Sequence, residues 1–296
     1  MTFVLYLTLV ENIIAILCQF IAIILWLNIL HANFFRKNRL RCKIANSMLL
    51  FLVCHTLFSI SDLPYRIYTI VQWQDVTAYP YLAYWVMIPD GNYFAIAPCF
   101  LLFLTIDRLL VLKLTYTLTV RKIFFYATIF FIISLVTAST IIFILELPLD
   151  IEIAKSCSVI SCMVTKSKGF PQLVSRMTFN TLNLLSSFLF FYLLPATGRT
   201  RQNNRVVMFS ILCEILLNII PGYFNLAFNS ITGKHSAAYF GEYTKMFCMI
   251  DTACCAFYYS YAFLKRKHCA KISLTPQLFS SSENMRSQFV FNRTYT

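Results

Sequence analysis

Two adjacent ionisable residues, Asp107 and Arg108, end an otherwise apolar run, YFAIAPCFLLFLTIDRLLV, from Tyr93 to Val111. As a helix rising ~1.5 Å per residue, this run is about 28 Å long, enough to cross the hydrocarbon core of a bilayer. Charges in such a segment are costly and usually mark a function. Because the pair lies where the helix leaves the lipid, it can reach water and still contact neighbouring helices. We therefore take this helix as the axis of the predicted molecule.

Three single acids, Asp62, Glu214 and Asp251, lie deep inside other apolar runs. Such acids either gather ions or water between helices or form a hydrogen-bond network that tightens packing. We favour the network for Glu214. For Asp62 and Asp251 the sequence leaves two alternatives open, a packing network or a sodium-like or water site at which the two face each other. The sequence has no Cys or His spacing typical of a metal site, so no metal and no other cofactor is expected.

The composition indicates an integral membrane protein. Apolar residues make up 59% of the chain and charged residues only 12%, against about 25% charged in soluble domains. The net charge of +13 would suggest nucleic acid as the partner of a soluble chain. Here the basic residues cluster in short loops between apolar runs, which favours contact with membrane lipid and no nucleic-acid binding.

Seven apolar runs are long enough to span a membrane, which predicts an all-α seven-helix bundle. The spans are expected at about 8–30, 47–70, 92–112, 123–145, 171–195, 206–230 and 243–264, followed by a polar, mostly disordered tail at 265–296. Pro89-Asp90-Gly91 predicts a turn, so we expect the third span to begin just after it. The alternative is a longer, kinked helix that begins at about Leu82. One set of alternate linkers carries 15 Lys and Arg and the other set 5. The N-terminus is therefore expected outside and the C-terminus in the cytoplasm.

Asp107-Arg108, at the cytoplasmic end of the third of seven helices, resembles the Asp-Arg-Tyr motif of G protein-coupled receptors, with Leu109 in place of Tyr. In that family the Arg is held by local and interhelical contacts when inactive, and on activation it faces the cavity that admits a G protein. The resemblance implies a receptor bundle in which Asp107 and Arg108 couple to a heterotrimeric G protein. The basic linker before the sixth span would join them, through Arg199, Arg201 and Arg205.

Other rhodopsin-like motifs are missing, which points to a divergent group. The sixth span has Asn218-Ile219-Ile220-Pro221 in place of Cys-Trp-x-Pro, and the seventh lacks the Pro of Asn-Pro-x-x-Tyr. The segments GEYTKMFCMIDTACCAFYYSYAFL and NRVVMFSILCEILLNIIPGYFNLAF are similar to nematode serpentine chemoreceptors, most of all to class BC (Srbc). This resemblance covers nearly the whole chain. It implies a plasma-membrane receptor of sensory neurons and their cilia that binds a small odorant or pheromone.

Candidate ligand-binding residues lie in the outer third of the predicted bundle: Arg66, Asp90, Tyr93 and Arg176. Two Arg near one cavity would suit an anionic or carboxylate ligand, unless both extend toward lipid headgroups. The other walls would be Phe, Tyr and Met, which suit a small apolar odorant. The sequence leaves both kinds of ligand open.

Three cysteines are candidates for modification. Cys157 and Cys162 lie in the second outer loop, where a local disulfide is expected, with two free thiols as the alternative. Cys269 follows a basic run at 265–267 and is a palmitoylation candidate. An unmodified, solvated tail is the alternative there.

Other classes of membrane protein fit less well. A transporter or channel for a small solute remains the alternative, but it would show repeats and Gly/Pro-broken helices, and Gly222 is the only Gly well inside a predicted span. A retinal protein needs a Lys in the middle of the last span, whereas Lys245 lies at its outer edge. An intramembrane enzyme needs paired groups at depth, and His55 has no evident partner, so no enzyme is expected.

Overall fold

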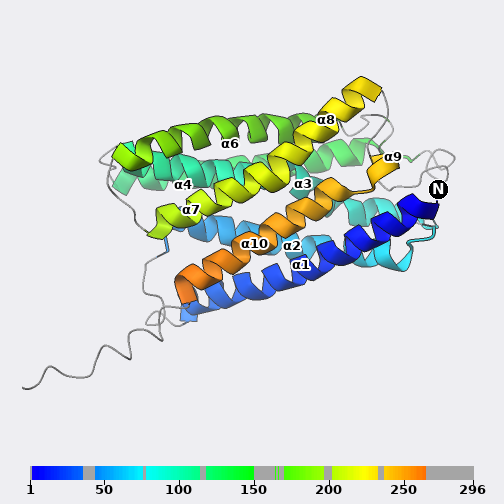
Figure 1. Cartoon of the computed structure of the whole chain (residues 1–296), viewed down its shortest axis with the longest axis horizontal. Coiled ribbons are helices and arrows are strands. Elements are labelled where there is room, and N and C mark those ends of the chain that lie inside the picture. The colour runs from blue at the N-terminus through cyan, green and yellow to red at the C-terminus, as the bar shows by residue number, and fades with distance from the viewer. Residues whose placement is uncertain are drawn as a thin grey trace, which may run out of the picture.

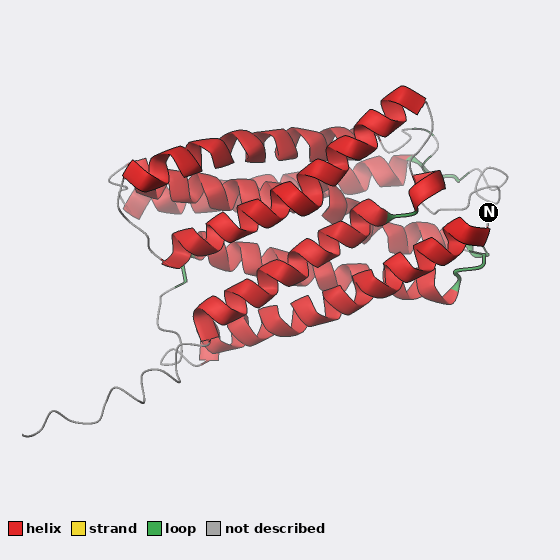
Figure 2. Cartoon of the chain, viewed as in Figure 1, coloured by secondary structure: helices red, strands yellow, loops and turns green. Residues whose placement is uncertain are grey.

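The computed structural model describes residues 2–35, 44–75, 78–113, 118–149, 164, 166, 170–196, 202–232 and 237–264. Within these residues the regular structure is entirely helical, without a strand (Figure 2). Seven helical segments are long and apolar enough to cross a membrane. The predicted all-α bundle of seven membrane-spanning helices is therefore confirmed, and the chain is a multi-pass membrane protein.

The sixth span consists of three consecutive helical segments, α7, η3 and α8. Its middle segment, η3, is a π-helical turn. The short helix α9 precedes the last span. The bounds are α1 Thr2–Phe35, α2 Asn46–Val71, α3 Pro80–Lys113, α4 Leu118–Leu145, α6 Phe170–Ala196, α7 Gln202–Glu214, η3 Ile215–Ile219, α8 Ile220–Thr232, α9 Ala237–Phe240 and α10 Tyr243–Leu264.

Helix α3 is the central element, as the sequence predicts. It packs against α2, α4, α6 and α7, while α1 packs against α2 and α10 (Figure 1). In the most apolar part of α3, 72% of the residues are buried, against 17% in α4. Charges on α3 therefore meet several neighbouring helices, whereas most of α4 faces lipid.

The start of the third span differs from the prediction. Helix α3 begins at Pro80 and continues through Pro89, Asp90 and Gly91, so the predicted turn is wrong and the longer helix is correct. A Cβ at Gly91 would lie 2.5 Å from Cζ of Phe143, so the missing side chain allows α3 and α4 to approach closely. Tertiary packing thus overrides the local turn preference.

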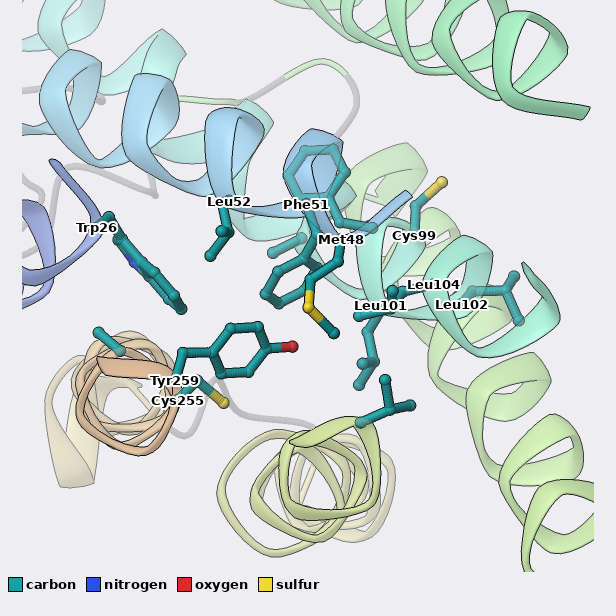
Figure 3. Close-up of a cluster of buried hydrophobic side chains, with 14 of the residues drawn as sticks. Trp26, Met48, Phe51, Leu52, Cys99, Leu101, Leu102, Leu104, Cys255 and Tyr259 are labelled. Atoms are coloured by element: carbon teal, nitrogen blue, oxygen red, sulfur yellow. The ribbon is translucent and has the colours of Figure 1, made fainter. Parts of the chain in front are cut away.

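The core joins helices from both halves of the chain (Figure 3). The Tyr259 ring lies edge-on to Trp26, with centroids 5.3 Å apart, and stacks on Phe51 at 5.9 Å. These aromatic contacts tie α10 to α1 and α2. Large apolar side chains also cover the outside, such as Phe130 (75% exposed) and Tyr192 (79% exposed), as lipid contact requires.

The start of α1 and the end of α10 lie at opposite ends of the bundle, at the right and the left of Figure 1. An odd number of spans requires this arrangement. We call the end with the starts of α1 and α10 the outer end. The end with the start of α2 and the C-terminus of α3 is the inner end. These names follow the topology predicted from the Lys and Arg distribution.

Candidate functional site

Six polar side chains near the outer end form one connected group, the outer cluster: Asp62, Tyr65, Arg66, Asp90, Glu242 and Lys245. Arg66 is at its centre and is only 1% exposed. Its Nε lies 3.0 Å from Asp62 Oδ2 and its Nη2 lies 2.9 Å from Asp90 Oδ1. Its Nη1 donates to Asn12 Oδ1 at 3.1 Å. All three guanidinium nitrogens are therefore bonded, to residues of α1, α2 and α3.

Lys245 of α10 completes the outer cluster. Its Nζ lies 2.7 Å from Asp90 Oδ2 and 3.2 Å from Glu242 Oε1. The Tyr65 hydroxyl accepts a hydrogen bond from Lys245 at 2.9 Å and donates to Glu242 at 2.9 Å. Asp90 is thus shared by two cations from different helices. Removing one member of such a buried group leaves an uncompensated charge, so the outer cluster joins α2, α3 and α10 firmly.

The turn before α10 adds a contact to α1. The backbone N–H of Glu242 donates to Glu11 Oε2 at 2.7 Å. Gly241, just before it, has φ +69°, and a Cβ there would collide with the Glu11 carboxylate. Only glycine combines this backbone conformation with this close approach. The start of α10 is therefore held against α1.

A second buried chain of hydrogen bonds runs through His55. Its Nδ1 lies 2.8 Å from the Tyr93 hydroxyl, which lies 3.0 Å from Thr252 Oγ1. These residues belong to α2, α3 and α10, so the chain crosses the bundle. The expectation that His55 lacks a partner is therefore wrong. The sequence does not show this partner, because Tyr93 lies 38 residues away and reaches His55 only when α2 and α3 pack together.

The middle of the bundle holds a polar group around Asn218, which we call the middle cluster: Glu214, Asn218 and Asp251. The Asn218 Nδ2 donates at 3.0 Å both to Glu214 Oε2 and to Asp251 Oδ2. Asn218 belongs to the π-helical η3, a rare geometry that is frequent at functional sites. A cavity of about 10 Å³ lies beside these residues, near the lower limit for one water molecule.

Two thiols adjoin the middle cluster. One sulfur or oxygen atom each from Cys213, Asp251 and Cys255 lies within 4.8 Å of the others. Two sulfurs and a carboxylate are a donor set suited to zinc or copper. The Cys255 Sγ is already hydrogen-bonded, 3.7 Å from Asp251 Oδ1 and 3.6 Å from Ser210 Oγ. Sequence spacing does not reveal this group, because its members come from α7 and α10.

Arg176 of α6 is buried, 2% exposed, but far less satisfied than Arg66. Its guanidinium carbon lies 3.4 Å from the centroid of the Phe94 ring, and its Nη2 is 3.4 Å from Asn218 Oδ1. Within the described part of the chain, its Nε and Nη1 have no hydrogen-bond partner. The same holds for the side-chain amides of Gln172 and Asn180, one turn away on either side. Buried polar groups are normally bonded, so this face of α6 has unused hydrogen-bonding capacity.

The inner end holds the charged pair from which the sequence argument starts. We call Ser47, Asp107, Arg108 and Arg121 the inner cluster. Asp107 accepts a hydrogen bond from Ser47 Oγ at 2.7 Å and lies 3.1 Å from Arg108 Nη2. Its second oxygen lies 3.7 Å from Arg121 Nε, and Arg108 Nη2 donates to Ser47 Oγ at 3.2 Å. Among the described residues, Arg108 Nε has no hydrogen-bond partner.

The four predicted ligand-binding residues do not form one site. Arg66 and Asp90 bond to each other, and Tyr93 bonds to His55 and Thr252. Arg176 contacts the middle cluster instead. Asp62 and Asp251 are not brought together either: Asp62 bonds to Arg66 and Asp251 to Asn218. Asp62 lies one helical turn before Arg66, so the guanidinium is its nearest available partner.

Of the remaining predicted residues, the structure describes only Arg205. Arg205 is exposed near the start of α7. The others lie outside the described residues: Cys157, Cys162, Arg199, Arg201 and Cys269.

Sequence reasoning missed six residues of these clusters: Ser47, Tyr65, Arg121, Asn218, Glu242 and Lys245. The spacing of Glu242 and Lys245, three residues apart at a helix start, places them on one face and was a usable signal. The sequence gives no comparable signal for Ser47 and Asn218, because their partners Asp107 and Asp251 lie on α3 and α10. Neither a known protein family nor any curated protein matches this chain.

Proposed function

We propose that the chain is a G protein-coupled chemosensory receptor, of the kind found among class BC nematode serpentine receptors. It would bind a small odorant or pheromone in the outer half of the bundle and activate a heterotrimeric G protein at the cytoplasmic, inner face. The observation that carries the proposal is the inner cluster, at the end of the most buried of seven membrane-spanning helices.

The inner cluster supports a switching role for Arg108. The carboxylate that holds Arg108 belongs to its own helix, at the preceding residue Asp107. Among the described residues, the polar link to α2 is a single hydroxyl, that of Ser47, and the link to α4 is the long contact from Arg121 to Asp107. Separation of the helices therefore costs few bonds and leaves Arg108 free to take a new partner, as helix movements in switching proteins require.

Arg176 indicates what kind of ligand the receptor would bind: one with a carboxylate or another strong hydrogen-bond acceptor. Its Nε and Nη1, which have no hydrogen-bond partner among the described residues, are donors of the kind that bind carboxylates. The adjacent Phe94 ring suits an apolar body. The Nη2 contact to Asn218 joins Arg176 to the π-helical part of the sixth span. A ligand that competes for this guanidinium would therefore favour one arrangement of that span over another.

The test is expression of the full chain in cells with a calcium or cAMP reporter, screened against small carboxylates and their matched esters and alcohols. We expect Arg108→Ala to abolish the response at unchanged surface expression. Arg176→Gln should lower the affinity for carboxylates by about tenfold or more, because it removes a charge-assisted hydrogen bond. It should lower the affinity for the esters less. His31→Gln, a change at an exposed residue near the inner end of α1, is the control.

A response that survives Arg108→Ala unchanged contradicts the coupling role. Uptake of the active compound without any G protein signal would instead favour the transporter alternative. An epitope tag on the C-terminal tail tests the orientation, since antibody should reach it only after permeabilisation. Staining of intact cells would reverse the assignment of inner and outer ends.

A further inference from the structure

A cavity with a volume of about 470 Å³ lies at the inner end, between α2, α3 and α4. Its two ends differ in chemistry. The polar end is lined by Ser47, Arg108, Arg121 and Lys122, and the apolar end by Phe100 and Ile132. A volume of this size is in the range of small-molecule sites, and the paired polar and apolar ends predict an amphipathic occupant.

The depth of the cavity matches one leaflet of a bilayer. Along α4 it extends from Arg121 to Ile132, and at ~1.5 Å per residue this distance is about 16 Å. The hydrocarbon core of a membrane is ~30 Å thick, so the cavity reaches roughly its middle. The basic residues then lie at headgroup level and the phenylalanine rings at acyl-chain level.

The charge of the polar end favours an anion. Three cations, Arg108, Arg121 and Lys122, line it against one acid, Asp107, which already has three partners. Arg108 Nε is buried and has no hydrogen-bond partner among the described residues. Arg121 reaches Asp107 only at 3.7 Å, and 37% of its side chain is exposed. Phosphate oxygens would supply the missing acceptors.

The cavity also opens away from the centre of the bundle. Lys122 and Tyr126, on its α4 side, are exposed, and α4 is the least buried of the seven spans. An occupant can therefore enter sideways from the membrane. A water-soluble phosphate would leave the apolar wall of Phe100, Phe103 and Phe124 uncovered.

We propose that this cavity binds one anionic phospholipid of the inner leaflet. Arg121 and Lys122 hold the phosphate from α4, Arg108 approaches it from α3, and one acyl chain lies between α2, α3 and α4. This site is separate from Arg176, and lipid binding here does not require that the chain couples to a G protein.

The test is native mass spectrometry of the purified full-length chain, equilibrated with phosphatidic acid or phosphatidylcholine. We expect one phosphatidic acid to be retained, and Arg121→Gln to weaken its binding by about tenfold, as the loss of a charge-assisted hydrogen bond implies. Arg205→Gln removes an exposed charge near the same end and should have no such effect. Leu50→Trp fills the apolar part of the cavity and should prevent retention, whereas Leu212→Trp on the lipid-facing surface should not.

Thermal unfolding of each variant distinguishes lost binding from lost folding, and only variants that unfold like the wild type are compared. Equal retention of phosphatidylcholine and phosphatidic acid would overturn the proposal. Equal losses in Arg121→Gln and Arg205→Gln would do so too, since they would indicate only a diffuse surface charge. Competition by soluble glycerol phosphate as strong as that by the lipid would overturn the assignment to a lipid and indicate a soluble anion.

Discussion

The outer and inner clusters are both built around a buried arginine with a nearby aspartate, yet they hold the helices together very differently. Arg66 bonds to an acid on its own helix and to another on α3, and Lys245 binds the second acid from α10. Arg108 bonds to the acid beside it on the same helix, and its only hydrogen bond to another helix goes to Ser47 within the described residues. The same residue types therefore produce a permanent joint at one end and a weak contact at the other.

This difference indicates where the bundle can move. At the outer end, separating α3 from α2 or α10 would leave charged groups unpaired in a low-dielectric interior, which costs several kcal/mol. At the inner end, separating α3 from α2 breaks the bonds to one hydroxyl. Opening at the inner end is therefore the cheaper motion, and four substitutions test this comparison.

Arg66→Gln should have the largest effect. It leaves Asp62 without its cation and Asp90 with only Lys245, and breaking a buried pair costs about 3–5 kcal/mol. We expect a loss of this size in the free energy of unfolding, measured by denaturant titration in detergent, together with reduced surface expression. Arg205→Gln should stay within ~0.5 kcal/mol of the wild type. Equal stability of the two variants would show that the outer joint is weak.

Gly241→Ala should have the next largest effect. A residue with a Cβ pays about 1–2 kcal/mol in the left-handed region, and here the Cβ also collides with Glu11. We expect the free energy of unfolding to fall by about 2 kcal/mol or more. Gly222→Ala is the matched control, since its Cβ would meet the flexible end of Met177 at 3.2 Å and Asn180 Nδ2 at an ordinary 3.7 Å. A neutral Gly241→Ala would mean that α10 can shift relative to α1 without cost.

Asp107→Asn tests the inner cluster through signalling. It removes the negative charge that holds both Arg108 and Arg121, so the state with Arg108 released becomes more populated. We expect ligand-independent signalling to rise by up to about tenfold, which corresponds to ~1.4 kcal/mol. The double variant Asp107→Asn with Arg108→Ala should be silent. A drop in basal signalling in the single variant would contradict a holding role for Asp107.

Ser47→Ala should have the smallest effect. It removes the hydroxyl between α2 and the pair on α3, a loss of about 1 kcal/mol. We expect basal signalling to rise by a few-fold and the free energy of unfolding to change by no more than ~1 kcal/mol. Ser61→Ala on the same helix is the control, because Ser61 is exposed and, among the described residues, its hydroxyl bonds only to the Phe58 carbonyl of its own helix. Identical behaviour of both variants would exclude the α2 contact from the inner cluster.

The sequence predicts the number and type of helices well because each apolar run must satisfy its own backbone in lipid. It also finds the pair Asp107 and Arg108, since neighbours in sequence remain neighbours in space. It fails at Asp90, where Pro and Gly signal a turn while the packing of α3 against Phe143 keeps a helix. Partners such as Lys245 for Asp90 depend on how whole helices pack, and no local pattern encodes that.

The π-helical turn at Ile215–Ile219 has a consequence for anyone who tracks helix faces along the sixth span. Each α-helical residue turns the chain by about 100°, and a π-turn accommodates one residue beyond that rhythm. A helical wheel drawn from Gln202 onward is therefore out of phase after Ile219. Deletion of a single residue there would restore the regular rhythm and keep Gly222 and the rest of α8 turned toward their present neighbours on α6.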